Sequence, residues 1–218
     1  MTRLRTLGAV GLLGMTAAAC ATAAPPPPPA LTYARQDCSA TPDLSTAVSL
    51  TPDKERAVHL VASPVGPETS CLVRAGVAAP YVLYALPADF GDKTLNVGST
   101  LEHMRIFAPN VEILDGQGNV IRTFERREYF YRGPVYSVQF RPRPGEAYLL
   151  VTAAHDLVGQ QYDAIQIGVA STVVTTGLYS AVIQTGTEAK QMRTFSYDGT
   201  VRVAINDTDT DTEEKPTT

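Results

Sequence analysis

The sequence is poor in the residue types that most often mark reactive or nucleic-acid-binding sites. It contains no tryptophan, three cysteines and three histidines in 218 residues. Lys and Arg total 18 against 22 Asp and Glu, so the net charge is −4 and no basic surface for nucleic acid is predicted. The hydrophobic fraction of 44% is typical of a globular protein with a core. These shortages exclude the nucleic-acid-binding classes and leave few residues for a metal site.

Motifs of the common enzyme classes are absent as well. No Gly-x-Ser-x-Gly segment is present to hold a serine nucleophile, and the glycine-rich stretch at Gly116 and Gly118 does not have the Walker form. The cysteines form no Cys-x-x-Cys pair and the histidines are scattered. His155 and Asp156 are neighbours, but adjacent residues of a strand point to opposite faces. We therefore expect no enzyme activity, no cofactor and no metal.

The first residues have the features of an export signal. Two arginines precede an apolar run over residues 7–15, and small residues follow it. A membrane-spanning helix takes ~20 apolar residues, so this run is too short to be one. We predict a signal peptide of the lipoprotein type over residues 1–19.

The cleavage site has two interpretations. Residues 17–20, Ala-Ala-Ala-Cys, resemble a bacterial lipobox that has Ala in place of the usual Leu. Lipidation of Cys20 would anchor the protein to the outer membrane, facing the periplasm, and the prolines at Pro25–Pro29 would form a stiff spacer behind the anchor. Ordinary cleavage after Ala19 or Ala23 is the alternative. We expect the anchored form, with no other contact to the membrane.

Cys38 and Cys71 remain once Cys20 is assigned to the lipid. An even pair of cysteines in an exported chain predicts a disulfide, because the compartment is oxidising. Closing a loop of this length would stabilise the fold by roughly 3–4 kcal/mol. We therefore expect these two residues to be bonded.

Strand-like runs recur along most of the chain, the pattern of a sandwich or barrel. The central one, Ile106–Phe124, predicts a β-hairpin because its middle, Asp115–Asn119, consists of residues that tolerate positive φ. Tyr81–Leu86 and Ala147–Ala153 are apolar on both faces, so we expect buried central strands. For residues 159–176, periodicity does not decide between helix and strand. Other strands are expected at residues 57–62, 71–74, 94–97, 102–107, 136–140 and 201–205.

These patterns predict a mainly β protein, organised as a single antiparallel, jelly-roll-like β-sandwich over residues 53–206 with little helix. A Pro-rich tether and extended arm would precede it over residues 20–52. Residues 207–218 are acidic and have almost nothing apolar to bury, so we expect a disordered tail.

The segment after the hairpin combines aromatic and basic residues. Aromatic ring faces bind sugars, and arginines donate hydrogen bonds, so the segment is a candidate for oligosaccharide binding. The same residue types are enriched at protein interfaces, which suits another envelope protein as partner. A third interpretation is that alternate rings fill the core while the others cover a sheet edge. The proposed ligand or partner surface comprises Arg126, Arg127, Tyr129, Tyr131 and Arg132.

One stretch resembles a known family. The segment Phe107–Asp115, Phe-Ala-Pro-Asn-Val-Glu-Ile-Leu-Asp, is similar to one in the maltose-operon periplasmic protein (MalM-like) family. Val120–Phe124 resembles the return strand of that family's hairpin, and Tyr129–Tyr131 its Tyr/Phe-rich stretch. Tyr148–Thr152 and Gly199–Val203 also fit. The resemblance implies a β-rich protein of the cell envelope that is associated with carbohydrate uptake.

This family contributes no catalytic residues that could be transferred to the chain. The resemblance spans roughly residues 81–205, and the chain departs from the family in ending with a short acidic tail. We therefore expect a non-enzymatic, periplasm-facing accessory protein linked to carbohydrate uptake or binding. The alternative is a structural or adaptor lipoprotein of the outer membrane that docks another envelope protein.

Overall fold

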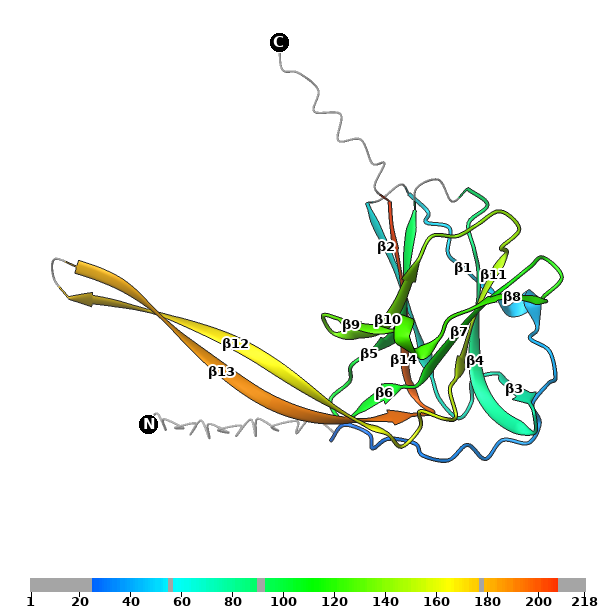
Figure 1. Cartoon of the computed structure of the whole chain (residues 1–218), viewed down its shortest axis with the longest axis horizontal. Coiled ribbons are helices and arrows are strands. Elements are labelled where there is room, and N and C mark those ends of the chain that lie inside the picture. Colours follow the sequence, from blue (N-terminus) through cyan, green and yellow to red (C-terminus); the bar gives the residue numbers. More distant parts are fainter. Residues whose placement is uncertain (1–24, 55–56, 90–92, 177–178, 208–218) are drawn as a thin grey trace, which may run out of the picture.

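The computed structural model describes residues 25–54, 57–89, 93–176 and 179–207. Most of these residues lie in strands, which confirms the prediction of a mainly β protein (Figure 1). Two 3₁₀ helices, η1 (Leu44–Thr46) and η2 (Arg126–Glu128), are the helical elements of this part of the chain. The strands are β1 (Val48–Ser49), β2 (Val58–Val65), β3 (Cys71–Arg74), β4 (Val77–Ala85), β5 (Thr94–Thr100), β6 (Arg105–Phe107), β7 (Pro109–Leu114), β8 (Val120–Thr123), β9 (Phe130–Arg132), β10 (Val135–Phe140), β11 (Tyr148–Ala153), β12 (Gln161–Thr176), β13 (Tyr179–Ser196) and β14 (Gly199–Asn206).

Two sheets enclose the main core. The first has the order β1-β4-β11-β7-β8, with β3 paired to β4, and the second has the order β2-β14-β5-β10-β9. The apolar strands β4 and β11 take interior positions in the first sheet, as predicted. Two pairings among the described strands are parallel, β1 with β4 and β13 with β6, so the fold is not purely antiparallel. Buried residues from both sheets meet in the core, among them Tyr84, Val111 and Leu149 from the first and Val97, Val138 and Val203 from the second.

The predicted central hairpin is formed by β7 and β8. The Asp115 carboxylate accepts two backbone N–H groups of the turn at 2.9 Å each, and Gly118 has a φ of +86°. On β7, Val111 and Ile113 are fully buried, whereas β8 lies at the edge of the sheet and exposes Val120. The edge position explains why the return strand mixes polar and apolar residues on one face.

The N-terminal arm packs along the two sheets, which together form the body of the protein. The predicted disulfide between Cys38 and Cys71 is confirmed, and it fastens the arm to the body. After Cys38, the arm crosses the outer face of the first sheet and adds β1 to it. Leu44 packs there on a second, smaller cluster of buried side chains that includes Leu72 and Leu150. The arm thus covers one end of this face and leaves the other end open.

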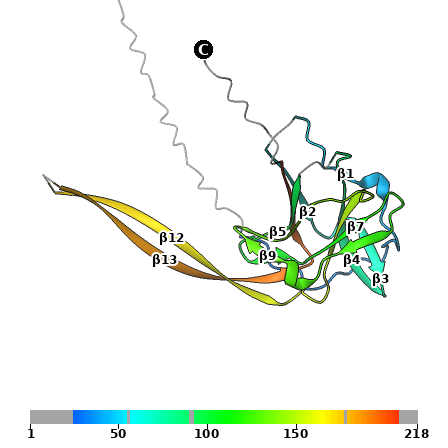
Figure 2. The same cartoon turned by 45° about the horizontal axis from the view of Figure 1, so that its top comes forward.

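A long hairpin of β12 and β13 projects from the body (Figures 1 and 2). The two strands pair without interruption from Gln161↔Thr194 to Thr176↔Tyr179. Residues 159–176, left open between helix and strand, are therefore a strand over nearly their whole length. The return strand had no predicted counterpart. Near the tip of the ribbon, side chains such as Val173 and Val182 are exposed, and a strand segment that buries neither face does not require the alternation that burial imposes.

The predicted signal peptide, Cys20 and residues 208–218 lie outside the described residues, so lipidation of Cys20 and disorder of the tail stay predictions. Within the described part of the chain, no helix has the length and apolar character needed to cross a bilayer.

Tyr84 is fully buried in the main core, and it makes the free energy of unfolding depend on pH in the alkaline range. Burial raises the pKa of its hydroxyl from 10.0 to about 12. Below pH 10 the hydroxyl is protonated in the folded and the unfolded chain, and its contribution to stability is fully present. Between pH 10 and 12 the unfolded chain loses the proton first, so we expect the free energy of unfolding to fall by up to about 2–3 kcal/mol.

Urea unfolding across this pH range measures the effect. The buried Tyr129 and the partly buried Tyr131 contribute in the same direction, since burial also raises the pKa of their hydroxyls. A Tyr84→Phe variant therefore serves as the reference and should lose stability less steeply above pH 10. Equal slopes for the variant and the wild type would contradict the assignment to Tyr84.

Candidate functional site

An open cleft of about 290 Å³ lies on the outer face of the first sheet, at the end that the arm leaves uncovered. Alternate residues of β4, β7 and β11 point away from the main core and form its floor. Its walls come from β3, from η2 and from the turn that follows β11. The polar residues that line it are Arg74, Asn110, Glu112, Arg126, Thr152, His155 and Asp156.

The lining contains two ion pairs. Arg74 bonds to Glu112, and Arg126 donates to both carboxylate oxygens of Asp156, with Nη2–Oδ1 at 2.8 Å and Nε–Oδ2 at 3.4 Å. The two cations and two anions balance, so the cleft offers hydrogen-bonding groups without a strong net charge. Such a surface suits an uncharged polar ligand better than an ion.

Local structure holds Arg126 in place. Its helix, η2, is closed by the Glu128 carboxylate, which accepts the backbone N–H of Glu125 at 2.6 Å. The guanidinium donates to the carbonyl of Pro109 at 3.1 Å and lies 5.8 Å from the centre of the Tyr129 ring. Fixed on several sides, the side chain presents its remaining donors in a set direction.

His155 and Asp156 correct one argument from sequence. The rule that neighbouring strand residues point to opposite faces does not apply to them, because β11 ends at Ala153 and both lie in the following turn, where both line the cleft. His155 Nδ1 lies within hydrogen-bonding distance of the Tyr197 hydroxyl. Among the described residues, no group of three or more His, Cys, Asp or Glu side chains is arranged to hold a metal ion.

The tyrosines of the predicted surface point inward to different degrees. Tyr129 is 5% exposed, and its hydroxyl accepts the backbone N–H of Val111 at 2.8 Å. Tyr131 is partly buried and stacks on Tyr162, with ring centres 3.6 Å apart. Neither ring presents an open face to the cleft, and no aromatic residue is among the described residues that line it.

The arginines of the predicted surface also separate. Arg126 lines the cleft, whereas Arg127 is exposed and pairs with Glu125 at 2.9 Å. Arg132 donates to the carbonyl of Ser137 at 2.6 Å. Of the five predicted residues, Arg126 is thus the one that the structure brings into the cleft.

Comparison with known proteins gives one finding. A family model described as "Maltose operon periplasmic protein precursor (MalM)" matches residues 76–141. Neither a curated protein nor a solved structure matches the chain. The matched part contains the segment Phe107–Asp115, so the resemblance noted for that segment is confirmed. The matched part also contains three residues that line the cleft, Asn110, Glu112 and Arg126. Over residues 76–141, therefore, the chain is similar to the maltose operon periplasmic protein family.

Proposed function

We propose that this protein is a non-enzymatic accessory protein of the periplasm that binds an oligosaccharide in the cleft of the first sheet. The description of the matched family names both the periplasm and the maltose operon, which supports the compartment and the link to carbohydrate. The observation that carries the proposal is the charge-balanced, hydrogen-bonding lining of the cleft.

The lining matches the chemistry of a neutral sugar. Each sugar hydroxyl both donates and accepts hydrogen bonds. Arg74 and Arg126 supply donors, Glu112 and Asp156 supply acceptors, and Asn110 supplies both. Planar guanidinium and carboxylate groups engage neighbouring hydroxyls in pairs, which adds geometric selectivity. Because no stacking ring lines the described cleft, binding would depend mainly on these hydrogen bonds.

The pairing of the charged groups supports binding over catalysis. Each cleft carboxylate bonds to an arginine, Glu112 to Arg74 and Asp156 to Arg126. His155 is turned to the hydroxyl of Tyr197 instead of to a carboxylate. General acid–base chemistry commonly uses a histidine or carboxyl group positioned to exchange a proton with the substrate. The arrangement supports a set of fixed recognition groups.

Titration calorimetry of the purified protein with maltodextrins and a broad oligosaccharide panel tests the proposal. We expect saturable binding that Arg126→Ala weakens by about 10–100-fold, because a hydrogen bond to a charged group contributes about 1.5–3 kcal/mol. Arg127→Ala is the matched control, since Arg127 is the next residue of the same short helix and does not line the described cleft.

The two variants separate the outcomes. Equal loss of affinity in both would place the sugar away from the cleft. Silence of the wild type across the whole panel would contradict oligosaccharide binding and favour the adaptor function, in which the protein docks another envelope protein.

A further inference from the structure

The ribbon formed by β12 and β13 has two long unpaired edges. Among the described strands, β12 pairs with β13 alone, and β13 pairs with β6 only over Thr194–Ser196. The 16 residues of β12, at roughly 3.3 Å per residue, extend over roughly 50 Å. Figures 1 and 2 both show the distal part projecting away from the two sheets. A two-stranded ribbon is marginally stable alone in water, so such an element needs further contacts.

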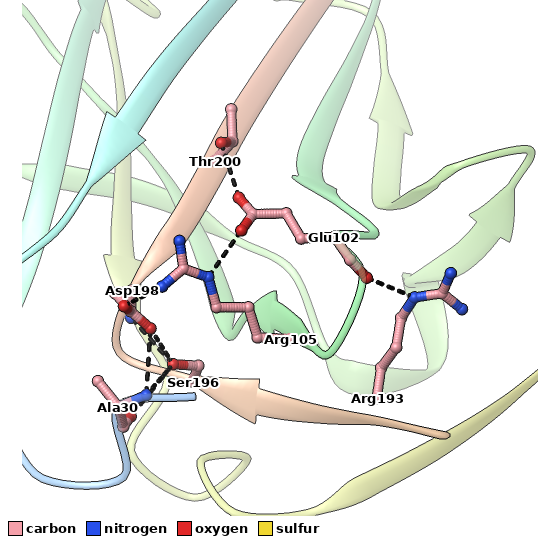
Figure 3. Close-up of polar contacts among 7 residues, drawn as sticks. All are labelled: Ala30, Glu102, Arg105, Arg193, Ser196, Asp198 and Thr200. Atoms are coloured by element: carbon pink, nitrogen blue, oxygen red, sulfur yellow. Dashed lines mark hydrogen bonds and ion pairs between the residues drawn. The ribbon is translucent and has the colours of Figure 1, made fainter. Parts of the chain in front are cut away.

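A polar network fixes the root of this ribbon to the body (Figure 3). Arg193 of β13 donates through Nε to the carbonyl of Glu102 at 2.6 Å. The Glu102 carboxylate accepts Arg105 Nε at 2.6 Å, and Arg105 also bonds to Asp198, just beyond the end of β13. Ser196, the last residue of β13, bonds to Asp198 in turn. The ribbon therefore leaves the body from an anchored base.

Aromatic packing holds the same root. Tyr162, near the start of β12, stacks on Tyr131, and Phe195, near the end of β13, packs edge-on against the buried Tyr136 with ring centres 5.3 Å apart. With the root held on both strands, the direction of the distal part is set before any partner arrives. Such pre-organisation lowers the entropic cost of association.

The distal sequence lacks the usual protection of a sheet edge. From Ala164 to Thr187 the chain contains no Asp, Glu, Lys, Arg or Pro. Natural edge strands commonly carry charges, especially Lys, or Pro to prevent pairing with another strand. Near the tip, the cross-strand neighbours Val173 and Val182 are 64% and 63% exposed. The ribbon is therefore open to strand addition.

We propose that two copies of this chain associate through the free edges of β12, antiparallel about a twofold axis, to form a four-stranded sheet. This inference is independent of the proposed function. The edge of β12 is free of other described strands along its whole length, whereas β6 occupies part of the edge of β13. Antiparallel pairing of one segment with itself is self-complementary, as a twofold interface requires.

Charge and shape favour a second copy as the partner. In a pairing centred on the neutral stretch, Asp163 at the root lies opposite the uncharged tip of the other copy, so no like charges meet across the strands. Antiparallel pairing also places the two bodies at opposite ends of the joined ribbon, because each ribbon projects from its own body (Figure 1). The bodies would not collide.

Sedimentation equilibrium of the purified full chain over a range of concentrations tests this pairing. We expect a monomer–dimer equilibrium in the wild type. The double variant Ser171→Lys/Val173→Lys places charges at exposed positions of β12 and should weaken the dimer at least ~10-fold. A matched control, Gln117→Lys/Gln139→Lys, adds the same charge at exposed positions of the body and should leave the dimer unchanged.

Hydrogen exchange supplies a second measurement. Amides of β12 should gain protection as the protein concentration rises, and circular dichroism should show that both double variants keep the native fold. A wild type that stays monomeric at every concentration overturns the proposal, and so does a Ser171→Lys/Val173→Lys variant that dimerises as tightly as the wild type. Protection of β12 that appears only after envelope extract is added would assign the ribbon to a different protein and overturn pairing with a second copy.

Discussion

Replacing Tyr129 by alanine should lower the free energy of unfolding by about 3–5 kcal/mol, as measured by urea unfolding. The ring is 5% exposed and stacks near Tyr136 with ring centres 5.5 Å apart, so truncation leaves a cavity in the main core. The hydroxyl also accepts the backbone N–H of Val111, and its loss leaves that buried donor without this acceptor. Both effects act in the same direction.

Tyr129→Phe separates the two contributions. It keeps the ring and removes only the acceptor, so we expect a loss of about 1–3 kcal/mol. A loss below about 1 kcal/mol in Tyr129→Ala would show that the ring does not support the core, because truncation of a buried aromatic residue costs several times more. The prediction also means that Tyr129→Ala is unsuited to mapping a ligand site, since reduced binding would follow from a damaged fold.

Removal of the disulfide should have an effect of similar size. In Cys38→Ser/Cys71→Ser we expect the free energy of unfolding to fall by about 3–4 kcal/mol, because the bond closes a loop with a sequence separation of 33 and restricts the unfolded chain. The bond also fastens the arm that carries Leu44 onto the second cluster of buried side chains. Urea unfolding in the absence of reductant measures the change.

Reductant provides the internal control for this prediction. It should lower the stability of the wild type to that of the double serine variant, and it should leave the variant itself unchanged. A wild type whose unfolding midpoint does not move on reduction would show that the arm is held by its non-covalent contacts alone.

Much of the body could be predicted from the sequence because its signals are local. The turn at Asp115 and Gly118 carries its own hydrogen-bonding and φ preferences, and the hairpin forms where those residues stand. Tyr81–Leu86 is apolar throughout and Ala147–Ala153 is apolar except for Thr152, and burial on both faces of an interior strand favours that composition. The disulfide between Cys38 and Cys71 could be predicted because these two cysteines form an even pair once Cys20 is assigned to the lipid.

The cleft could not be predicted in this way. Arg74 and Glu112 are 38 residues apart and Arg126 and Asp156 are 30 apart, and no local pattern indicates which residues the sheet will bring together. The strand predicted over residues 147–153 does end at Ala153, but the sequence does not show how the following turn brings Asp156 beside Arg126. Arg126 was identified because its segment combines aromatic and basic residues, but Tyr129 and Tyr131 of that segment pack inward. The sequence therefore indicated Arg126 but not the residues that line the cleft with it.

The position of β14 has a consequence for the order of folding. It is the last strand in the described chain, yet it lies between β2 and β5, with Asn206 opposite Val58. Among the described strands, β2 has no sheet partner other than β14. A chain that emerges from its N-terminal end therefore cannot complete the second sheet step by step. Its core closes only when residues 199–206 are available, so folding of the body cannot finish before those residues have been synthesised.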